Sequence, residues 1–297
     1  MCSPDSMKFG LAFAASIGTE PDTALETCRV AEQAGFESVW GGEHVIFPST
    51  IESAYPYTAD GKVPATPDTP IPDPLIWLAY VAAVAPTLRL GTCILILPQR
   101  NPLVLAKEIA TLDHLSGGRV ELGIGVGWLR EEFEALGVPW ERRGARTDEY
   151  VEALRTVWSG RHVEFHGEFV DFEPLTCTPR PAQGADVPIL VGGDSPAALR
   201  RAAKLADGYY PGEGTIDGLR DLIGRLHEEC ERQGRDPQEV EINAMFSTQM
   251  SDPAAGVEAM RELGVARVMV PAFFFAGDGG LDRLAAFGES TVLPNRP

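Results

Sequence analysis

An acidic residue and a histidine stand side by side in the stretch WGGEHVIFPS, at the end of an apolar run. Glu43 and His44 would be costly in a buried strand without partners. Just past the end of a strand, a histidine can face a pocket and titrate near neutral pH. We therefore take His44 as a candidate general acid or base, with Glu43 beside it. The alternative is a loop histidine that caps a helix or pairs with a carboxylate.

A second candidate segment is LGTCILILPQRNP, in which Gly91, Thr92, Cys93 and Ile94 belong to a predicted strand. Glycine tolerates unusual dihedral angles and close backbone contact, so this strand can bulge or admit a flat ligand. The alternative is an ordinary buried strand. Cys93 has no basic neighbour in sequence to lower its thiol pKa, which favours a small core residue over a nucleophile. Arg100 is a candidate anion contact.

Glycines alternate in ELGIGVGWLREE, at the end of another predicted strand. Backbone amides at the start of the helix that follows suit a ligand anion, so Gly125, Gly127 and Trp128 are candidate cofactor contacts. The spacing G-x-G-x-G is not the dinucleotide fingerprint G-x-G-x-x-G, and this segment therefore does not indicate a Rossmann site.

The stretch PILVGGDSPAAL offers the best cradle for an anion. Gly192 and Gly193 free the backbone, Asp194 follows them, and Ser195 is a good N-cap before a proline in the first helical turn. Free amides and a hydroxyl thus converge where a phosphate can bind. The alternative is a well-capped helix without a ligand.

Composition narrows the classes of function. The chain has 297 residues, 44% of them hydrophobic, and a net charge of −18 at pH 7, which disfavours nucleic acid or an anionic membrane as partner. Five cysteines without metal-like spacing indicate neither a disulfide framework nor a zinc site, and the histidines form no metal-binding pattern. The sequence shows no apolar membrane span and no signal peptide, so we expect a cytoplasmic protein.

Short apolar runs alternate with helical patterns along the whole chain, and we count eight candidate strands. This alternation predicts β-α-β units and a parallel sheet. Eight such units in a chain of this length predict one α/β domain, a (β/α)8 TIM-type barrel over residues 8–297, with residues 1–7 as a loose extension. A doubly wound open sheet is the alternative. Both folds place their ligand at the carboxyl ends of the strands.

Two segments break the alternation. Residues 44–72 are rich in proline, threonine and aromatic residues and are too long for an ordinary connection, which indicates a lid-like loop. Residues 161–181 alternate polar and apolar side chains around a His-Gly-Glu turn, which predicts an inserted hairpin. We expect both insertions at the carboxyl-terminal face of the barrel.

Four stretches together resemble the bacterial luciferase-like superfamily, and within it the oxidoreductases that use the deazaflavin coenzyme F420. They are AEQAGFESVWGGEH, RLGTCILILPQRNPLVLAKEIATLDHLSGGRVELGIGVGW, EEFEALGVPWERRGARTDEYVEALRTVW and PILVGGDSPAALRRAAKLADGYYP. They keep their order and span most of residues 8–212. A long co-linear match is more specific than any one of the motifs.

The resemblance implies a ring bound in the barrel mouth, with His44 near its reactive edge and a non-prolyl cis peptide around Thr92 to Ile94. The glycine run ending at Gly127 and the turn from Gly192 to Ser195 would hold the ribityl and phosphate portions. Glu43 would orient the imidazole, contact the ring or pair with a lid residue. Several arginines are candidates for the polyglutamate tail of the coenzyme or for surface ion pairs: Arg119, Arg130, Arg142, Arg143 and Arg146.

The chain also departs from the sugar-phosphate dehydrogenases it resembles. Those enzymes carry a tryptophan four residues beyond the histidine, where this chain has Pro48, and an acid after the glycine run, where it has Trp128. We therefore expect a flat or apolar substrate instead. The aromatic candidates to contact it are Phe47, Tyr55, Tyr57, Trp77 and Trp128.

The leading expectation is an F420-dependent oxidoreductase that exchanges a hydride between C5 of the coenzyme and a small organic substrate, as a homodimer like many relatives. The first alternative is an FMN-dependent monooxygenase that uses oxygen and reduced flavin from a separate reductase. A second alternative, from another class, is a non-catalytic protein that binds the deazaflavin.

Overall fold

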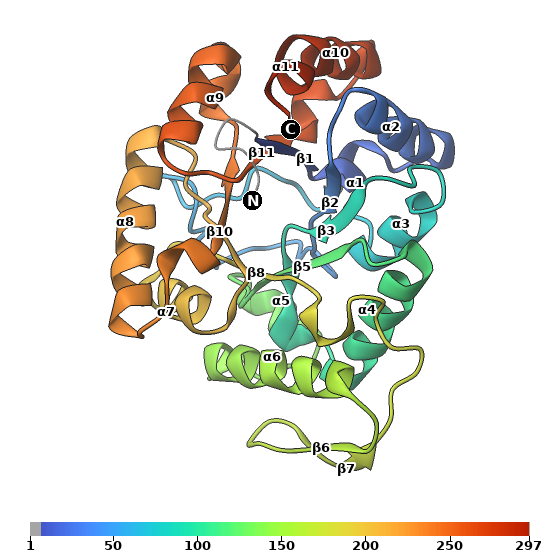
Figure 1. The fold of residues 1–297 in the computed structure, drawn as a ribbon, viewed down its shortest axis with the longest axis vertical. Helices are drawn as coiled ribbons and strands as arrows, with labels where there is room; N and C mark the ends of the chain where they lie inside the picture. Colours follow the sequence, from blue (N-terminus) through green and yellow to red (C-terminus); the bar gives the residue numbers. More distant parts are fainter. Residues whose placement is uncertain (1–6, 297) are drawn as a thin grey trace.

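The computed structural model describes residues 7–296, and its central feature is a closed parallel barrel (Figure 1). Each barrel strand pairs with its two neighbours, and pairing of β3 with β5 closes the ring. The strands are β1 (Lys8–Ala12), β2 (Ser38–Gly41), β3 (Arg89–Thr92), β5 (Val120–Gly125), β8 (Ile189–Gly192), β9 (Gly208–Tyr210), β10 (Glu241–Met245) and β11 (Arg267–Pro271). The predicted (β/α)8 barrel is confirmed, and the open sheet is excluded.

Helices surround the barrel on the outside (Figure 1). Four of them begin with a proline after a capping side chain: Asp73, Asn101, Ser195 and Asp252 each accept hydrogen bonds from amides of the first turn. The longer helices are α2 (Pro21–Gln33), α3 (Pro74–Val81), α4 (Pro102–Ser116), α5 (Arg130–Ala135), α6 (Arg143–Ser159), α7 (Pro196–Leu205), α8 (Ile216–Arg232), α9 (Pro253–Glu262) and α10 (Gly280–Phe287). Two further helices are short: α1 (Ala14–Ile17) and α11 (Leu293–Asn295).

The predicted loose extension falls mostly outside the described residues, because residues 1–6 are not described. Met7 is an exception to that prediction. Its side chain is buried, and its amide donates a hydrogen bond to the carbonyl of Asn295. Met7 therefore belongs to the barrel domain.

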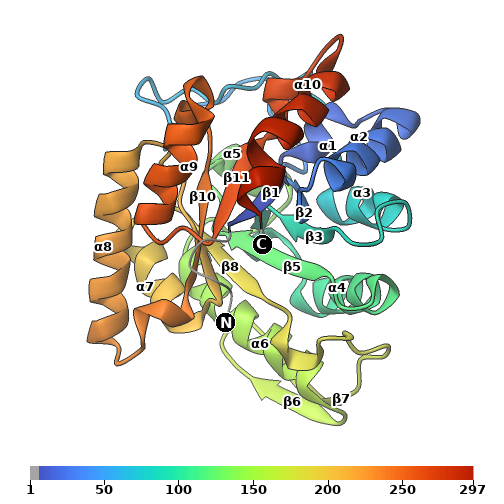
Figure 2. The same cartoon turned by 45° about the horizontal axis from the view of Figure 1, so that its top comes forward.

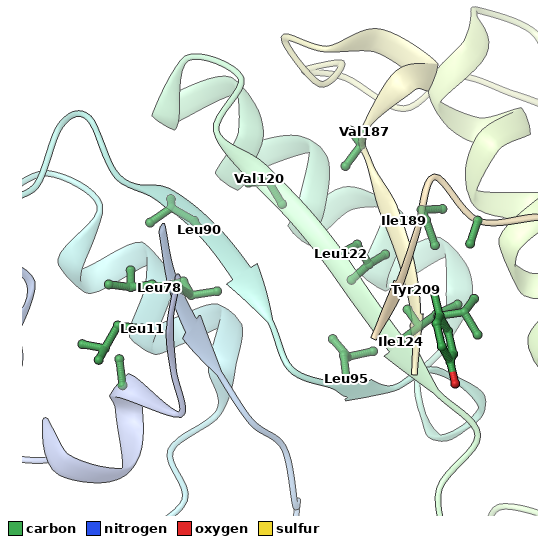
Figure 3. Packing of buried hydrophobic residues seen from close by; sticks show 14 of the residues in the cluster. Leu11, Leu78, Leu90, Leu95, Val120, Leu122, Ile124, Val187, Ile189 and Tyr209 are labelled. Carbon is green, nitrogen blue, oxygen red and sulfur yellow. The ribbon is translucent and has the colours of Figure 1, made fainter. Parts of the chain in front are cut away.

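Side chains on the outer face of the strands join the helices in one large buried cluster, which includes Leu90, Leu122, Ile189 and Leu78 of α3 (Figure 3). A second, smaller cluster fills the inside of the barrel around Trp40. The indole of Trp40 lies against Gly91, where an added Cβ would come within 2.1 Å of the ring. Gly91 therefore makes room for a core tryptophan on this face of the strand.

The third strand bulges at its carboxyl end. The peptide bond between Cys93 and Ile94 is cis, within the segment where the resemblance implied it. The chain then continues as β4 (Leu95–Ile96), which pairs with the end of β5. Gly125 admits this bulge, since a Cβ there would collide with the side chain of Ile94.

The inserted hairpin is present, formed by β6 (Val163–His166) and β7 (Asp171–Leu175). It packs along the outer side of α6 (Figures 1 and 2). Glu149 of this helix accepts hydrogen bonds from the amides of Glu168, Phe169 and Val170. The helix separates the hairpin from the barrel. Our expectation that this insertion lies at the carboxyl-terminal face was therefore wrong.

A buried ion network closes the opposite, amino-terminal end of the barrel. Arg267 is 1% exposed and donates to both oxygens of Glu121, at 2.8 and 2.9 Å, and to Glu37 at 2.5 Å. Arg89 also bonds Glu121. Burial opposes ionisation of Glu121, but the charges of Arg267 and Arg89 outweigh it and hold the pKa of Glu121 below its usual range.

Replacing Arg267 tests this network. Arg267→Met should lower the free energy of unfolding by about 3–5 kcal/mol, because buried carboxylates lose their partner. Arg220→Met, which removes an exposed cation paired with Asp217, should change it by less than about 1 kcal/mol. Urea unfolding measures both, and equal small effects would contradict the assignment.

Because the folded pKa of Glu121 is depressed, its stabilisation should be present above about pH 4.3 and lost as the pH falls below it.

Candidate active site

The carboxyl ends of the strands carry the predicted site, and His44 lies there just after β2. Its Nδ1 atom is 3.1 Å from Oε2 of Glu132, a residue of α5. The imidazole is mostly buried and the carboxylate fully so, with 13% and 0% of their side chains exposed. The structure thus gives the candidate catalytic histidine an acidic partner 88 positions away in sequence.

The carboxylate of Glu132 also holds the backbone that follows the histidine. Its Oε1 atom accepts from the amides of Val45 at 2.6 Å and Ile46 at 3.3 Å. An ionised carboxylate only accepts hydrogen bonds, so we assign the proton of His44 to Nδ1, which leaves Nε2 for a ligand. Sequence reasoning missed Glu132, although it lies five residues beyond Gly127 in the motif already singled out.

Glu43 has different partners. It is 7% exposed and accepts from the amide of Ile96 at 2.5 Å and from Nε of Arg100 at 2.8 Å. Burial raises the pKa of Glu43, and Arg100 and the Ile96 amide partly offset this effect. Its hydrogen bonds link the end of β2 to β4, and none of them goes to His44. Arg100 also pairs with Asp73 and Glu108, so it is an internal ion-pair partner and not the free anion contact we considered.

The bulged third strand lies at the centre of the mouth. A Cβ added at Gly125 would lie 1.8 Å from Ile94, and one added at Gly192 would lie 3.0 Å from it. The hydroxyl of Thr92 donates to the carbonyl of Gly123, so it is already paired. Burial raises the pKa of Cys93 to about 12, so it stays a neutral thiol and acts as a core residue, as predicted.

The predicted anion cradle forms the turn between β8 and α7. Ser195 caps α7 by accepting from the amide of Ala198 at 3.2 Å, and Leu199 donates to the carbonyl of Ser195. Pro196 has no amide hydrogen, so the amide of Ala197 is the one in this turn that lacks a partner within the helix. Asp194 faces away from that helix start: its Oδ1 accepts from the amide of Gly212 at 2.8 Å and from the hydroxyl of Tyr209 at 3.4 Å. It therefore joins the turns after β8 and β9.

The residues of the loop 44–72 are all described, and none lies in a helix or strand. Its aromatic residues Phe47, Tyr55 and Tyr57 form, with Trp128, an aromatic wall beside His44. Ring centroids are 4.8 Å apart for His44 and Phe47, 5.7 Å for His44 and Trp128, and 5.1 Å for Tyr55 and Trp128. Trp77, in contrast, is buried in α3 and donates to the carbonyl of Gly18, so it serves the core.

The loop crosses the mouth (Figure 2). Tyr57 lies against the turns after β8 and β9, since a Cβ at Gly212 would come within 2.2 Å of its ring. On the other side Glu131 accepts from the amides of Glu52 at 2.6 Å and Ser53 at 2.9 Å, and from the Ser53 hydroxyl at 2.7 Å. These bonds outweigh burial and lower the pKa of Glu131 to about 2. Adjacent carboxylates of α5 thus anchor the loop.

The described part of the chain has neither a metal-binding cluster nor a helix that could span a membrane. Within residues 7–296, no cluster of three or more histidine, cysteine, aspartate or glutamate side chains has a metal-binding arrangement. No helix among these residues has the length and apolar character needed to cross a membrane.

A model of the luciferase-like monooxygenase family matches residues 7–287. The chain belongs to this family. An uncharacterised protein of Mycobacterium tuberculosis is 37% identical over 247 residues, 83% of each chain. The F420-dependent glucose-6-phosphate dehydrogenase of Nakamurella multipartita is 32% identical over 258 residues, 83% of this chain and 70% of that one.

An FMNH2-dependent dimethylsulfone monooxygenase of Pseudomonas putida is 32% identical over 157 residues, 52% of this chain and 43% of that one. Among solved structures, the coenzyme F420-dependent tetrahydromethanopterin reductase of Methanopyrus kandleri has a TM-score of 0.77 at 18% identity, covering 98% of this chain and 100% of that one. The relatives of this chain thus include an F420-dependent and an FMNH2-dependent enzyme. The likeness to the solved structure shows the barrel fold.

The tautomer of His44 can be measured without a substrate. Imidazole ¹⁵N chemical shifts should show the neutral ring protonated at Nδ1, and Glu132→Gln should remove that preference because an amide donates as well as accepts. Glu134→Gln, an exposed change on the same helix, serves as control. Protonation of His44 at Nε2 in the unchanged protein would contradict the assignment.

The anchoring of the loop predicts a local effect of Glu131. Glu131→Ala should speed amide hydrogen exchange in residues 44–72, because three hydrogen bonds to the loop are lost. Exchange in the barrel strands should not change. Mass spectrometry of peptic fragments measures both, with Glu134→Ala as the matched control. Unchanged exchange in the loop would show that other contacts hold it.

Proposed function

We propose that the protein is an F420-dependent oxidoreductase that transfers a hydride between C5 of the deazaflavin and a small organic substrate. The observation that carries this proposal is the contact between Nδ1 of His44 and the carboxylate of Glu132. Because Glu132 binds Nδ1, the other ring nitrogen, Nε2, is left to contact a ligand at the strand ends. A relative with 32% identity over 83% of this chain is an F420-dependent dehydrogenase, which supports the choice of cofactor.

The residues at the mouth fit a flat ring. Glycine at positions 125 and 192 makes room for the side chain of Ile94, and we expect the ring to lie on the bulge that these glycines admit. The capped start of α7 offers amides for the phosphate of the cofactor. Tyr57 lies over this turn, so we expect it to line the phosphate or to move when the cofactor binds.

When bound, the deazaflavin would supply the hydride chemistry. The chain would supply orientation and a proton: Glu132 fixes the imidazole of His44, and Nε2 accepts or donates the proton of the substrate group that is oxidised or reduced. Glu43, Thr92 and Cys93 support the third strand from within. Their proposed role is to position the ring and not to react.

The aromatic wall favours a flat or apolar substrate. Trp128 contacts both His44 and Tyr55. Pro48 and Trp128 occupy the positions of the tryptophan and the acid that the resemblance associates with sugar-phosphate dehydrogenases. We infer that sugar phosphates are poor substrates and that small molecules with an aromatic or aliphatic body are preferred.

The second candidate is an FMN-dependent monooxygenase with a separate reductase as partner. The FMNH2-dependent relative from Pseudomonas putida favours it.

We also infer a homodimer. Three apolar side chains are exposed on two helices that contact each other: Ile76 and Tyr80 of α3 and Val104 of α4 expose 73%, 49% and 56% of their surface. Sedimentation velocity tests this inference, and a monomer at micromolar concentration would contradict it.

Binding and oxygen dependence separate the candidates. Fluorescence titration should show micromolar affinity for oxidised F420 and weaker affinity for FMN. With a panel of alcohols, aldehydes and activated alkenes, turnover should proceed without oxygen. His44→Ala should lower the turnover number by about 10²–10⁴-fold while F420 still binds. Preference for FMN together with a need for oxygen would establish the monooxygenase, and binding of F420 without any effect of His44→Ala would indicate a non-catalytic binding protein.

A further inference from the structure

Arg143 is the first residue of α6, and two contacts orient its side chain. Its Nε atom donates to the carbonyl of Gly127 at 3.2 Å, and its guanidinium lies 3.6 Å from the ring centroid of Trp140. Trp140 in turn packs edge-on against the buried ring of Phe133. The guanidinium is therefore oriented by an aromatic face and by the glycine turn that follows β5.

Its charge is not compensated within the described chain. Among residues 7–296, no carboxylate forms an ion pair with Arg143. Burial and the nearby charge of Arg130 both lower the pKa of Arg143, which is the direction expected for a cation that lacks an acidic partner. An arginine nevertheless stays charged at neutral pH, so this side chain is ready for an external anion.

The other arginines considered for an anionic tail have partners of their own. Arg119 donates to the carbonyls of Ala82, Ala85 and Leu88, before β5 and therefore at the opposite end of the barrel. Arg142 pairs with Glu168. Arg146 donates to the carbonyls of Pro139 and Glu141. Arg130 forms ion pairs with Glu134 and Glu141.

The position of Arg143 fits a ligand that continues beyond the phosphate cradle. Strands β5 and β8 are neighbours, with Ile124 paired to Val191, so the turn at Gly127 and the turn at Ser195 leave the barrel side by side. The helices that follow also touch: Arg201 of α7 donates to the carbonyl of Gly144, the residue after Arg143. Arg143 therefore lies on the side of the rim that carries α7, where a ligand that extends outward from the start of that helix can reach it.

We propose that Arg143 binds a carboxylate of the glutamate tail of F420 and so selects the tailed deazaflavin over FMN. This inference rests on the proposed function and adds a specificity-determining residue to it. A planar guanidinium suits a carboxylate, which it can bind through two parallel hydrogen bonds. FMN ends at its phosphate and has no group to place there.

The test compares three ligands by fluorescence titration: F420, the same deazaflavin with its ribityl chain but without phosphate and tail, and FMN. Arg143→Gln should weaken F420 binding by about tenfold or more and leave the other two unchanged. Arg143→Lys should recover part of the loss. The matched control is Arg142→Gln, which removes an equal charge one residue away from an exposed pair and should leave all affinities unchanged.

Each other outcome overturns the assignment. Equal loss for F420 and FMN, with the phosphate-free ligand unaffected, would show that Arg143 contacts the phosphate. Equal loss for all three would show that it only supports the turn at Gly127. Unchanged F420 affinity would remove it from the site while the proposed function stands. If the unchanged protein bound neither deazaflavin, the proposed function itself would fail.

Discussion

The carboxylate of Glu132 is the contact on which the arrangement of the mouth depends. It is fully buried, and it accepts hydrogen bonds from the imidazole of His44 and from the two amides that follow it. A buried charge of this kind is tolerable only when its oxygens are paired. One side chain of α5 therefore fixes both the orientation of the histidine and the base of the loop 44–72, so the proton-handling group and the cover of the site are positioned together.

The sequence was sufficient for the fold because its signals are local. Each strand and helix has its own periodicity, and each cap, such as Ser195, lies within three residues of its partner. Pairings over long separations were not predictable: His44 meets Glu132 and Glu43 meets Arg100 only once the barrel closes. The glycines show the same limit. Gly91 and Gly125 did signal a close approach, but the approaching groups are Trp40 and Ile94.

A strongly acidic chain can bind an anionic cofactor when the attraction is local. With a net charge of −18, the long-range field opposes binding, so affinity must come from oriented donors. The capped start of α7 supplies such amides, and Arg143 adds a charge without an acid partner in the described chain. Arg130 and Arg142 pair with glutamates, and Arg146 donates to backbone carbonyls, which leaves few places for an anion on this part of the rim.

The most direct test of the account is a crystal structure of the protein with oxidised F420. The account predicts the deazaflavin ring on the bulge at Ile94, with Nε2 of His44 facing the ring edge that carries C5 and Nδ1 still bonded to Glu132. A ring bound away from the third strand, or an imidazole turned so that Nε2 contacts Glu132, would contradict the central claim that this carboxylate prepares the histidine for hydride transfer chemistry.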